Sequence, residues 1–320
     1  FCNVDERAVI GCYDSSSIYK VPRMLHNQEI DDIVCEKLQL AVPPADFSLW
    51  DKIVNNLDHP LQIVDIAMVG KYVDLTESYK SLNEALIHAG IHTKTKVNIV
   101  YVDAETLTAG NLSAIQSVDA ILVPGGFGNR GVEGKIKAIE FARNNNIPFL
   151  GICLGMQMAA IEFARNVLHL KDANSTEMDE KTKHPVIDLM EAQKTVKKKG
   201  GTMRLGSYPC DIQTNSLAHE IYGQTSITER HRHRWEFNNA YLSQFENAGM
   251  IASGKNPGTG LVEIIELKNH PFFIGVQYHP ELKSTVENPQ PIFVHFIKAA
   301  KTFADKKNAV KNPLLQSEMI

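Results

Sequence analysis

A glycine-flanked cysteine between a short apolar run and a longer helix-like run constrains the fold of this chain most strongly. Residues 147–150 predict a buried strand, and residues 156–165 predict a helix. Between them stands Gly151-Ile152-Cys153-Leu154-Gly155. Gly-x-Cys-x-Gly at a strand-to-helix turn is the thiol form of a nucleophile elbow, in which the glycines permit a sharp turn. A helix N-terminus beside the sulfur favours the thiolate, so Cys153 is a candidate nucleophile.

A second motif, His279-Pro280-Glu281, follows another apolar run near the end of the chain. In an extended segment residues two apart face the same way, so we expect Glu281 to hold and polarise the His279 ring. Cysteine, histidine and glutamate then serve as nucleophile, base and orienting group of a covalent acyl-transfer site. The alternatives are an inert buried cysteine and a plain His-Pro turn. The elbow and the His-x-Glu spacing favour the catalytic interpretation.

A glycine-rich segment, residues 124–131, follows the apolar run 119–123. Backbone N–H groups in such a turn can stabilise an oxyanion, although a phosphate-binding loop or an ordinary turn has the same composition. This turn, Cys153 and His279 each follow a predicted strand. In open α/β sheets the carboxyl ends of the strands form the edge where ligands bind, so we expect the three to form one site.

The order of predicted elements indicates an α/β fold. Strand patterns alternate with helix patterns, which implies a doubly wound, mostly parallel sheet with flanking helices. The predicted strands are residues 63–69, 96–102, 120–123, 147–152, 261–267 and 272–278, and the predicted helices are residues 30–38, 76–89, 133–145, 156–165 and 292–303.

Composition excludes several classes of protein. The 320 residues carry a net charge of −4, which argues against a nucleic-acid partner. Five irregularly spaced cysteines favour a reducing compartment over a disulfide framework. No apolar run approaches the roughly 20 residues of a membrane span, and no signal peptide is visible. We expect a cytoplasmic protein that binds neither nucleic acid nor membrane.

These motifs resemble the class I, triad-type glutamine amidotransferases, which have a flavodoxin-like fold. Further segments narrow the resemblance to the CTP synthase family: residues 70–72, 79–81, 172–177, 200–206 and 229–234, together with residues 1–4 and 17–22. The resemblance implies hydrolysis of L-glutamine by Cys153, His279 and Glu281, with backbone amides near Gly126 and Leu154 holding the oxyanion. It places glutamine binding at Gly126, Phe127, Leu154, Gly155, Met156, Gln157, Glu177 and Arg234.

The resemblance also implies how the chain is organised. Residues 1–42 would be the end of an amidoligase domain, 43–60 a linker, 61–305 the glutamine amidotransferase domain and 306–320 a tail. Because the sequence begins at Phe1 without methionine, we expect a fragment. In the full enzyme, the ammonia would aminate UTP to CTP in a reaction that uses ATP and Mg²⁺. GTP would be an allosteric activator, and the enzyme would assemble as a homotetramer.

Nucleotide contacts in this chain are expected to be few. By resemblance, the ATP-contacting residues are Tyr13, Asp14 and Ser15, and those linked to GTP activation are Lys80 and Arg130. We expect no metal site and no cofactor in the glutaminase domain. No segment has the phosphate loop of the ligase, so the chain by itself should make no CTP.

Other motifs carry less weight. Residues 249–256 resemble a phosphate loop but have Asn256 where Ser or Thr must meet magnesium. His231 and His233 lack the neighbouring cysteines of a zinc site, and the sequence assigns them no role. The lysines near 197–199 predict a solvated loop. Two functional alternatives stay open: another thiol hydrolase of the same fold, such as a γ-glutamyl hydrolase or a DJ-1-like peptidase, and a non-catalytic assembly module.

Overall fold

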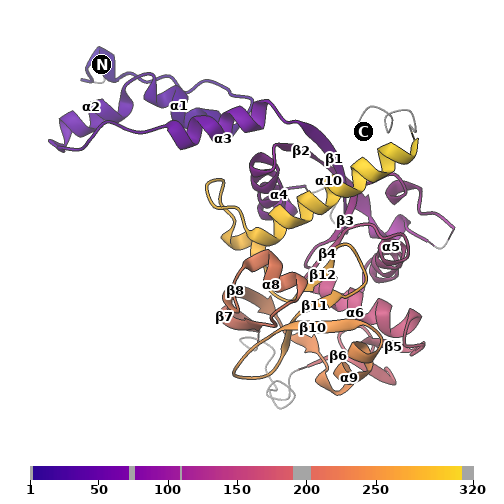
Figure 1. The fold of residues 1–320 in the computed structure, drawn as a ribbon. Coiled ribbons are helices and arrows are strands. Elements are labelled where there is room, and N and C mark those ends of the chain that lie inside the picture. Colours follow the sequence, from indigo (N-terminus) through magenta and orange to yellow (C-terminus); the bar gives the residue numbers. More distant parts are fainter. Residues whose placement is uncertain (1–2, 72–75, 109, 190–202, 312–320) are drawn as a thin grey trace.

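A nine-stranded sheet forms the centre of the computed structural model, which describes residues 3–71, 76–108, 110–189 and 203–311 (Figure 1). Its first five strands in spatial order pair in parallel, and the remaining four pairings are antiparallel. In spatial order the strands are β2 (Thr95–Asp103), β1 (Gln62–Gly70), β3 (Ala120–Val123), β4 (Phe149–Ile152), β12 (Phe273–Val276), β11 (Val262–Leu267), β10 (Met250–Lys255), β7 (Arg204–Ile212) and β8 (Ser226–His233).

The two faces of this sheet are both apolar, as the buried strand β1 illustrates. Val64, Ile66 and Met68 point to one face, and Ala67 and Val69 to the other, because side chains alternate along a strand. The first face packs against α4 (Lys80–His92), α8 (Leu217–Tyr222) and α10 (Pro291–Lys311); the second packs against α5 (Val132–Asn144), α6 (Leu154–Asn166) and α9 (Leu242–Asn247). Buried helices on both faces are the reason that parallel strands read as continuous apolar runs.

A small three-stranded sheet completes the second face. Its strands are β5 (Ala173–Ser175), β6 (His184–Leu189) and β9 (Trp235–Phe237), in the order β5-β6-β9. Short 3₁₀ helices occupy several connections: η1 (Glu6–Ala8), η2 (Ile18–Lys20), η3 (Thr76–Tyr79), η4 (Ala104–Thr106), η5 (Ser113–Ile115), η6 (Asn239–Tyr241) and η7 (Pro280–Lys283).

The N-terminal segment extends away from the sheet as an arm of three helices (Figure 1): α1 (Val21–His26), α2 (Ile30–Lys37) and α3 (Ser48–Asp58). Tyr19 fixes its inner end. The Tyr19 hydroxyl lies 2.6 Å from a Glu84 carboxylate oxygen and 2.8 Å from His88 Nε2, and both partners belong to α4. His88 Nδ1 lies 3.1 Å from the hydroxyl of Ser284, which follows η7. The arm is thus connected, through α4, to the turn that carries Glu281.

Several of the elements predicted from the sequence match observed ones. The α/β class with flanking helices is confirmed, and the strand predicted at 120–123 has the bounds of β3. The sheet is mixed rather than mostly parallel, because β7, β8, β10 and β11 pair only antiparallel. The predicted tail begins inside a helix, since α10 continues to Lys311; residues 312–320 lie outside the described ranges.

The lysines at 197–199 and the segment 200–202 lie outside the described residues. Within the described ranges, no helix has both the length and the apolar character needed to cross a membrane.

Candidate active site

Cys153 stands between β4 and α6 and is the N-cap residue of the helix. Its backbone has φ 52° and ψ −103°, a conformation that a residue with a side chain rarely adopts and that costs of order 1–3 kcal/mol. The backbone N–H of Cys153 donates to Val276 O at 2.7 Å, which ties the elbow to the neighbouring strand β12. The strained turn therefore aims the thiol out of the sheet at the N-terminus of α6.

The two flanking glycines have a different role from the one the sequence suggested. Neither has a positive φ; the strained torsion belongs to Cys153. A Cβ at Gly155 would lie 2.0 Å from Val123 O, and a Cβ at Gly151 would lie 2.7 Å from the backbone carbon of Gly155. The glycines are thus required because α6 approaches the ends of β3 and β4 too closely to leave room for side chains.

His279 and Glu281 follow β12, the parallel neighbour of β4. Ile152 pairs with Val276 in that register, so the residues just beyond the two strands meet at one edge. His279 Nδ1 lies 2.7 Å from Glu281 Oε1, as the His-x-Glu spacing predicted. The predicted reason was wrong: the segment is not extended there, because Glu281 lies in η7 and His279 is its N-cap residue.

The environment of His279 strongly favours its protonated form. Burial lowers the pKa of His279, but hydrogen bonds and charge interactions with Cys153 and Glu281 outweigh that effect and raise the pKa to about 10. Gly125, in the loop after β3, packs against the same ring, since a Cβ there would lie 2.8 Å from His279 Cε1. The geometry is that of a cysteine–imidazolium pair with a carboxylate behind it.

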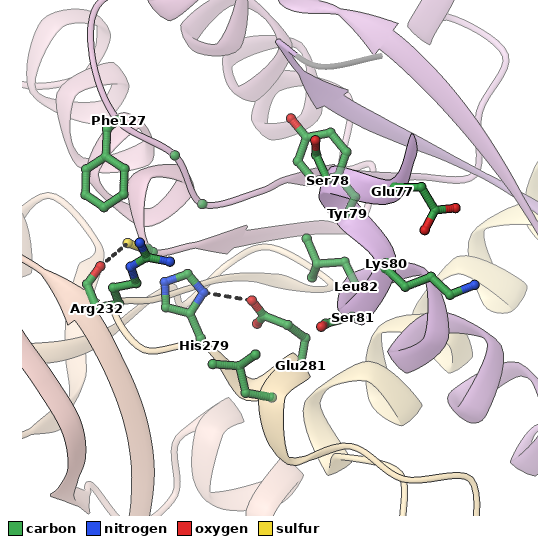
Figure 2. A pocket seen from close by; sticks show the side chains of 14 residues that line it. Glu77, Ser78, Tyr79, Lys80, Ser81, Leu82, Phe127, Arg232, His279 and Glu281 are labelled. Carbon is green, nitrogen blue, oxygen red and sulfur yellow. Dashed lines mark hydrogen bonds and ion pairs between the residues drawn. The ribbon is translucent and has the colours of Figure 1, made fainter. Parts of the chain in front are cut away.

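A cavity of about 480 Å³ opens over the pair. Figure 2 shows Glu281 and the side chains of η3 and the start of α4 to one side of His279, and Phe127 and Arg232 to the other. The cavity is lined by Glu77, Ser78, Tyr79, Lys80, Ser81, Leu82, Gly125, Gly126, Phe127, Cys153, Arg232, His279, Glu281 and Leu282.

Six of the eight predicted glutamine-binding residues belong to the loop after β3 or to the elbow helix, and these six divide into two groups. Gly126 and Phe127 line the cavity, and Leu154 packs close to Gly126, where a Cβ would lie 3.5 Å from Leu154 Cδ2. The other three residues of the elbow helix are turned into the protein: Gly155 contacts β3, the Met156 side chain lies in the apolar core, and Gln157 is buried with hydrogen bonds to protein groups.

Glu177 and Arg234 do not line this cavity, but they lie near the loop that does. Glu177 Oε1 accepts a hydrogen bond of 2.9 Å from the Gly128 N–H. Burial raises the pKa of Glu177, while that hydrogen bond and the charges of Lys71 and Arg234 act in the opposite direction. Both side chains therefore belong to one charged cluster beside the loop 125–128.

The residues associated with nucleotides are spread over three places. Lys80 lines the cavity and forms an ion pair of 3.2 Å with Glu84. Arg130 lies in the loop before α5 and pairs with Glu105 at 2.8 Å. Tyr13, Asp14 and Ser15 are exposed in the arm before η2, outside the lining of the cavity.

Sequence reasoning missed several residues around the pair. Arg232 was noticed only within the His-Arg-His-Arg run, and Gln277, two residues before His279, was not noticed at all. The alternation of β8 explains that run: His231 and His233 point inward, and Arg232 points outward. Arg232 O is 4.0 Å from Cys153 Sγ, and Gln277 Nε2 is 3.7 Å from it. The strand pattern was the available signal for Arg232.

The two buried histidines belong to a polar cluster behind the site. His231 Nδ1 lies 2.8 Å from His233 Nε2. Glu263 from β11 approaches His231 at 3.7 Å, and Arg204 from β7 lies 2.6 Å from Glu263. Glu236 from β9 lies 3.4 Å from His233. In the described part of the chain, no group of three or more His, Cys, Asp and Glu side chains is placed to hold a metal ion.

Comparison with known proteins identifies relatives of this chain. The family model described as glutamine amidotransferase class-I matches residues 74–299, and the one described as CTP synthase N-terminus matches residues 1–40. The CTP synthase of Cytophaga hutchinsonii is 57% identical over 309 residues, covering 96% of this chain and 57% of the relative. That of Flavobacterium johnsoniae is 55% identical, covering 94% of this chain and 56% of the relative. The chain thus spans little more than half the length of the curated relatives it matches.

A solved structure of a CTP synthase glutaminase domain has a similar fold. The glutaminase domain of the Trypanosoma brucei CTP synthase, with bound acivicin, matches with a TM-score of 0.71 and 40% identity. The match covers 75% of this chain and 94% of that domain.

Proposed function

The chain belongs to the glutamine amidotransferase class-I family, and on that basis we propose that it is the glutaminase part of a CTP synthase. One observation carries the proposal. Cys153 and His279 line one cavity, and Glu281 lies 2.7 Å from the far nitrogen of the His279 ring. A thiol at a helix N-terminus, an imidazolium and an orienting carboxylate are the groups that nucleophilic acyl transfer requires.

The first half-reaction consumes the side-chain amide of L-glutamine. The Cys153 thiolate attacks the amide carbon, and the carbonyl oxygen becomes an oxyanion. The N–H of Leu154 is available to it, because the first N–H groups of a helix have no partner within the helix. The Gly126 N–H is the second proposed donor. His279 then gives its proton to the departing nitrogen, so ammonia leaves and a γ-glutamyl thioester forms on Cys153.

The second half-reaction releases glutamate. Neutral His279 takes a proton from water, and the resulting hydroxide attacks the thioester carbon. The C–S bond breaks, the Cys153 thiolate returns, and His279 is again protonated. Glu281 keeps the ring oriented and stabilises its charge in both halves. The raised pKa of His279 supports this cycle, because the resting state already holds the proton that the first half donates.

Recognition of the amino-acid end of glutamine falls to two charged side chains in this proposal. Arg234 pairs with the α-carboxylate, and Glu177 pairs with the α-ammonium. Their position in one charged cluster beside the loop 125–128 supports a common role. Gly126 and Phe127 line the cavity that contains Cys153, and they belong to the loop whose Gly128 N–H donates to Glu177.

We further propose that this chain is part of an enzyme that aminates UTP to CTP. The match of residues 1–40 to the CTP synthase N-terminus supports residues 1–42 as the end of the amidoligase domain, followed by a linker at 43–60 and the glutaminase at 61–305. ATP, Mg²⁺, UTP and CTP would bind in the amidoligase domain, and GTP would activate the enzyme allosterically. The enzyme would be a homotetramer in the cytoplasm. The described residues do not fit a Mg²⁺ site, so no step here passes through the metal.

The test is a glutaminase assay on the purified chain. We expect release of glutamate from L-glutamine, and labelling by a glutamine-like electrophile at Cys153 ahead of the other four cysteines. With UTP, ATP, GTP and Mg²⁺ added, we expect no CTP. Hydrolysis of γ-glutamyl peptides in place of free glutamine would instead support the thiol-hydrolase alternative, and labelling spread evenly over the cysteines would contradict the assignment of the nucleophile.

A further inference from the structure

Gln277 is a buried amide in contact with the reacting sulfur. It follows β12 directly and is fully buried. Its backbone N–H donates to Glu263 O at 2.9 Å, which fixes the chain at this point. Its side-chain Nε2 lies 3.7 Å from Cys153 Sγ, within the range of an N–H···S hydrogen bond. An uncharged polar side chain is seldom buried without a partner, and here the partner is the nucleophile.

The orientation of this amide is determined by its neighbours. Gln157 Nε2 donates to Trp235 O at 2.9 Å, and a backbone carbonyl can only accept. The same Gln157 NH₂ group lies 3.2 Å from Gln277 Oε1 and donates its second proton there. Gln277 must therefore turn its oxygen toward Gln157 and its NH₂ group toward Cys153. A flipped Gln277 amide would place two NH₂ groups against each other.

The groups around Cys153 Sγ distinguish the thiol from the thiolate. A thiol can donate to Arg232 O, which is 4.0 Å away. A thiolate only accepts, and its two donors are His279 and the NH₂ group of Gln277. The hydrogen bond between Cys153 and His279 also raises the pKa of the histidine. Because the Gln277 donor is already held in place, it stabilises negative charge on sulfur without reorganisation.

We propose that Gln277 is a further catalytic residue that donates a hydrogen bond to the Cys153 thiolate, with Gln157 as the positioning residue that orients it. The inference rests on the proposed glutaminase function. Sulfur carries negative charge before the attack and again when the thioester breaks, and is neutral in the thioester. The Gln277 hydrogen bond therefore assists the leaving sulfur in the second half-reaction, so its loss should slow hydrolysis of the thioester more than its formation.

The first test needs no glutamine. Alkylation of Cys153 by iodoacetamide is followed by mass spectrometry of its peptide, over a range of pH. In Gln277→Met, which keeps the shape and removes the donor, we expect the pH midpoint of the alkylation rate to rise by about one unit. On the acid side of the profile the rate should then fall about tenfold, the size expected for one lost hydrogen bond to a charged group. In Gln277→Glu the fall should be larger. Gln290→Met is the matched control, because Gln290 is also buried but pairs with Glu229, and its rate should not change.

The second test separates this role from simple packing. Quenched-flow measurement with glutamine should show the γ-glutamyl thioester accumulating in Gln277→Met and not in Gln290→Met. If Gln277→Met fails to fold, as judged by circular dichroism, Gln157→Met serves in its place, since an unheld Gln277 amide should give a smaller fall in alkylation rate. An unchanged alkylation profile in a folded Gln277→Met protein would overturn the inference. A changed profile without glutaminase activity would uphold it and overturn the proposed function.

Discussion

His279 and the buried pair His231 and His233 all stand beside glutamates, yet their pKa values move in opposite directions. His279 Nδ1 lies 2.7 Å from Glu281, and its pKa is raised to about 10. His231 Nε2 lies 3.7 Å from Glu263, and its pKa is lowered to about 2; that of His233 is lowered to about 3. A neighbouring carboxylate is therefore not enough to keep a histidine protonated.

Burial lowers the pKa in both places, so the remaining partners decide. Around His279, the hydrogen bonds with Cys153 and Glu281 outweigh burial. Around the buried pair, the positive charge of Arg204 acts in the same direction as burial and lowers the pKa of both rings further. Arg204 lies 2.6 Å from Glu263, so it occupies the carboxylate that would otherwise favour an imidazolium.

The difference separates the histidine that we propose for catalysis from two buried histidines that stay neutral. His231 and His233 are neutral and share a hydrogen bond of 2.8 Å, in which one ring donates and the other accepts. Because both rings are neutral, their approaches to Glu263 and Glu236, at 3.7 Å and 3.4 Å, are not ion pairs. A histidine near a glutamate is therefore not by itself a base, and the nearest cation has to be known as well.

Cys153→Ala tests the difference between His279 and the buried pair His231 and His233, and it should have the largest effect of the variants considered. Loss of the nucleophile should lower the glutaminase rate by at least about 10⁴-fold. The pKa of His279 should fall as well, because its hydrogen bond with Cys153 is lost. Glutamate release measures the first effect, and titration of the histidine NMR signals measures the second, with His231 and His233 as internal controls. A His279 pKa equal to that of the wild type would contradict this account.

Glu281→Gln should have the next largest effect. The isosteric amide keeps the shape but not the charge, and kcat should fall by about 10²- to 10⁴-fold. A pKa raised to about 10 means that the imidazolium persists at neutral pH and is lost as pH rises through that value. The alkaline limb of kcat/KM should therefore move to lower pH in the variant. The exposed Glu287→Gln is the control, and an unmoved limb would argue against the role of Glu281.

Arg204→Met tests the other side of the comparison. Removing the cation leaves Glu236 and Glu263 buried without it, and breaking such a buried pair costs about 3–5 kcal/mol. Chemical denaturation measures the loss. Arg204→Met/Glu263→Gln should recover part of it, because one of the uncompensated carboxylates is gone. In the single variant the pKa values of His231 and His233 should rise, and titration curves unchanged from the wild type would contradict the assigned influence of Arg204.

Local patterns in the sequence were enough to predict the parallel half of the fold. Apolar runs bounded by glycine or proline located β3 and β4, and the periodic segment after Cys153 located α6. The antiparallel half was predicted less completely. The strand predicted at 261–267 corresponds to β11, but β7 and β8 alternate in burial and were not delimited as strands. The pairing of strands depends on tertiary packing, which local propensity does not predict.

The same limit applies to the candidate site. The sequence made Cys153, His279 and Glu281 candidates because elbow and spacing are local features, and the three residues line one cavity in the structure. It did not identify Gln277, whose partner Cys153 is remote in sequence, or the assembly of Arg204 with Glu263, which joins two strands. A contact between remote residues leaves no periodic trace in a single sequence.

Arg234→Ala extends the comparison to a second arginine and has the smallest expected effect. Arg204 is buried between glutamates and should act on stability; Arg234 is half-buried near Glu177 and should act on binding. Loss of a charge-assisted pair with the α-carboxylate of glutamine corresponds to about 2–3 kcal/mol, so KM should rise about 30- to 150-fold with little change in stability.

Two further variants sharpen that last prediction. Arg234→Lys should rescue poorly, because an ammonium lacks the paired donors of guanidinium. Arg230→Ala removes an outward-facing arginine of β8 and should leave KM unchanged. Steady-state kinetics with glutamine and denaturation curves of each variant decide the matter. If Arg234→Ala lowers stability and leaves KM unchanged, Arg234 belongs with Arg204 as a structural cation, and glutamine must be held by other groups.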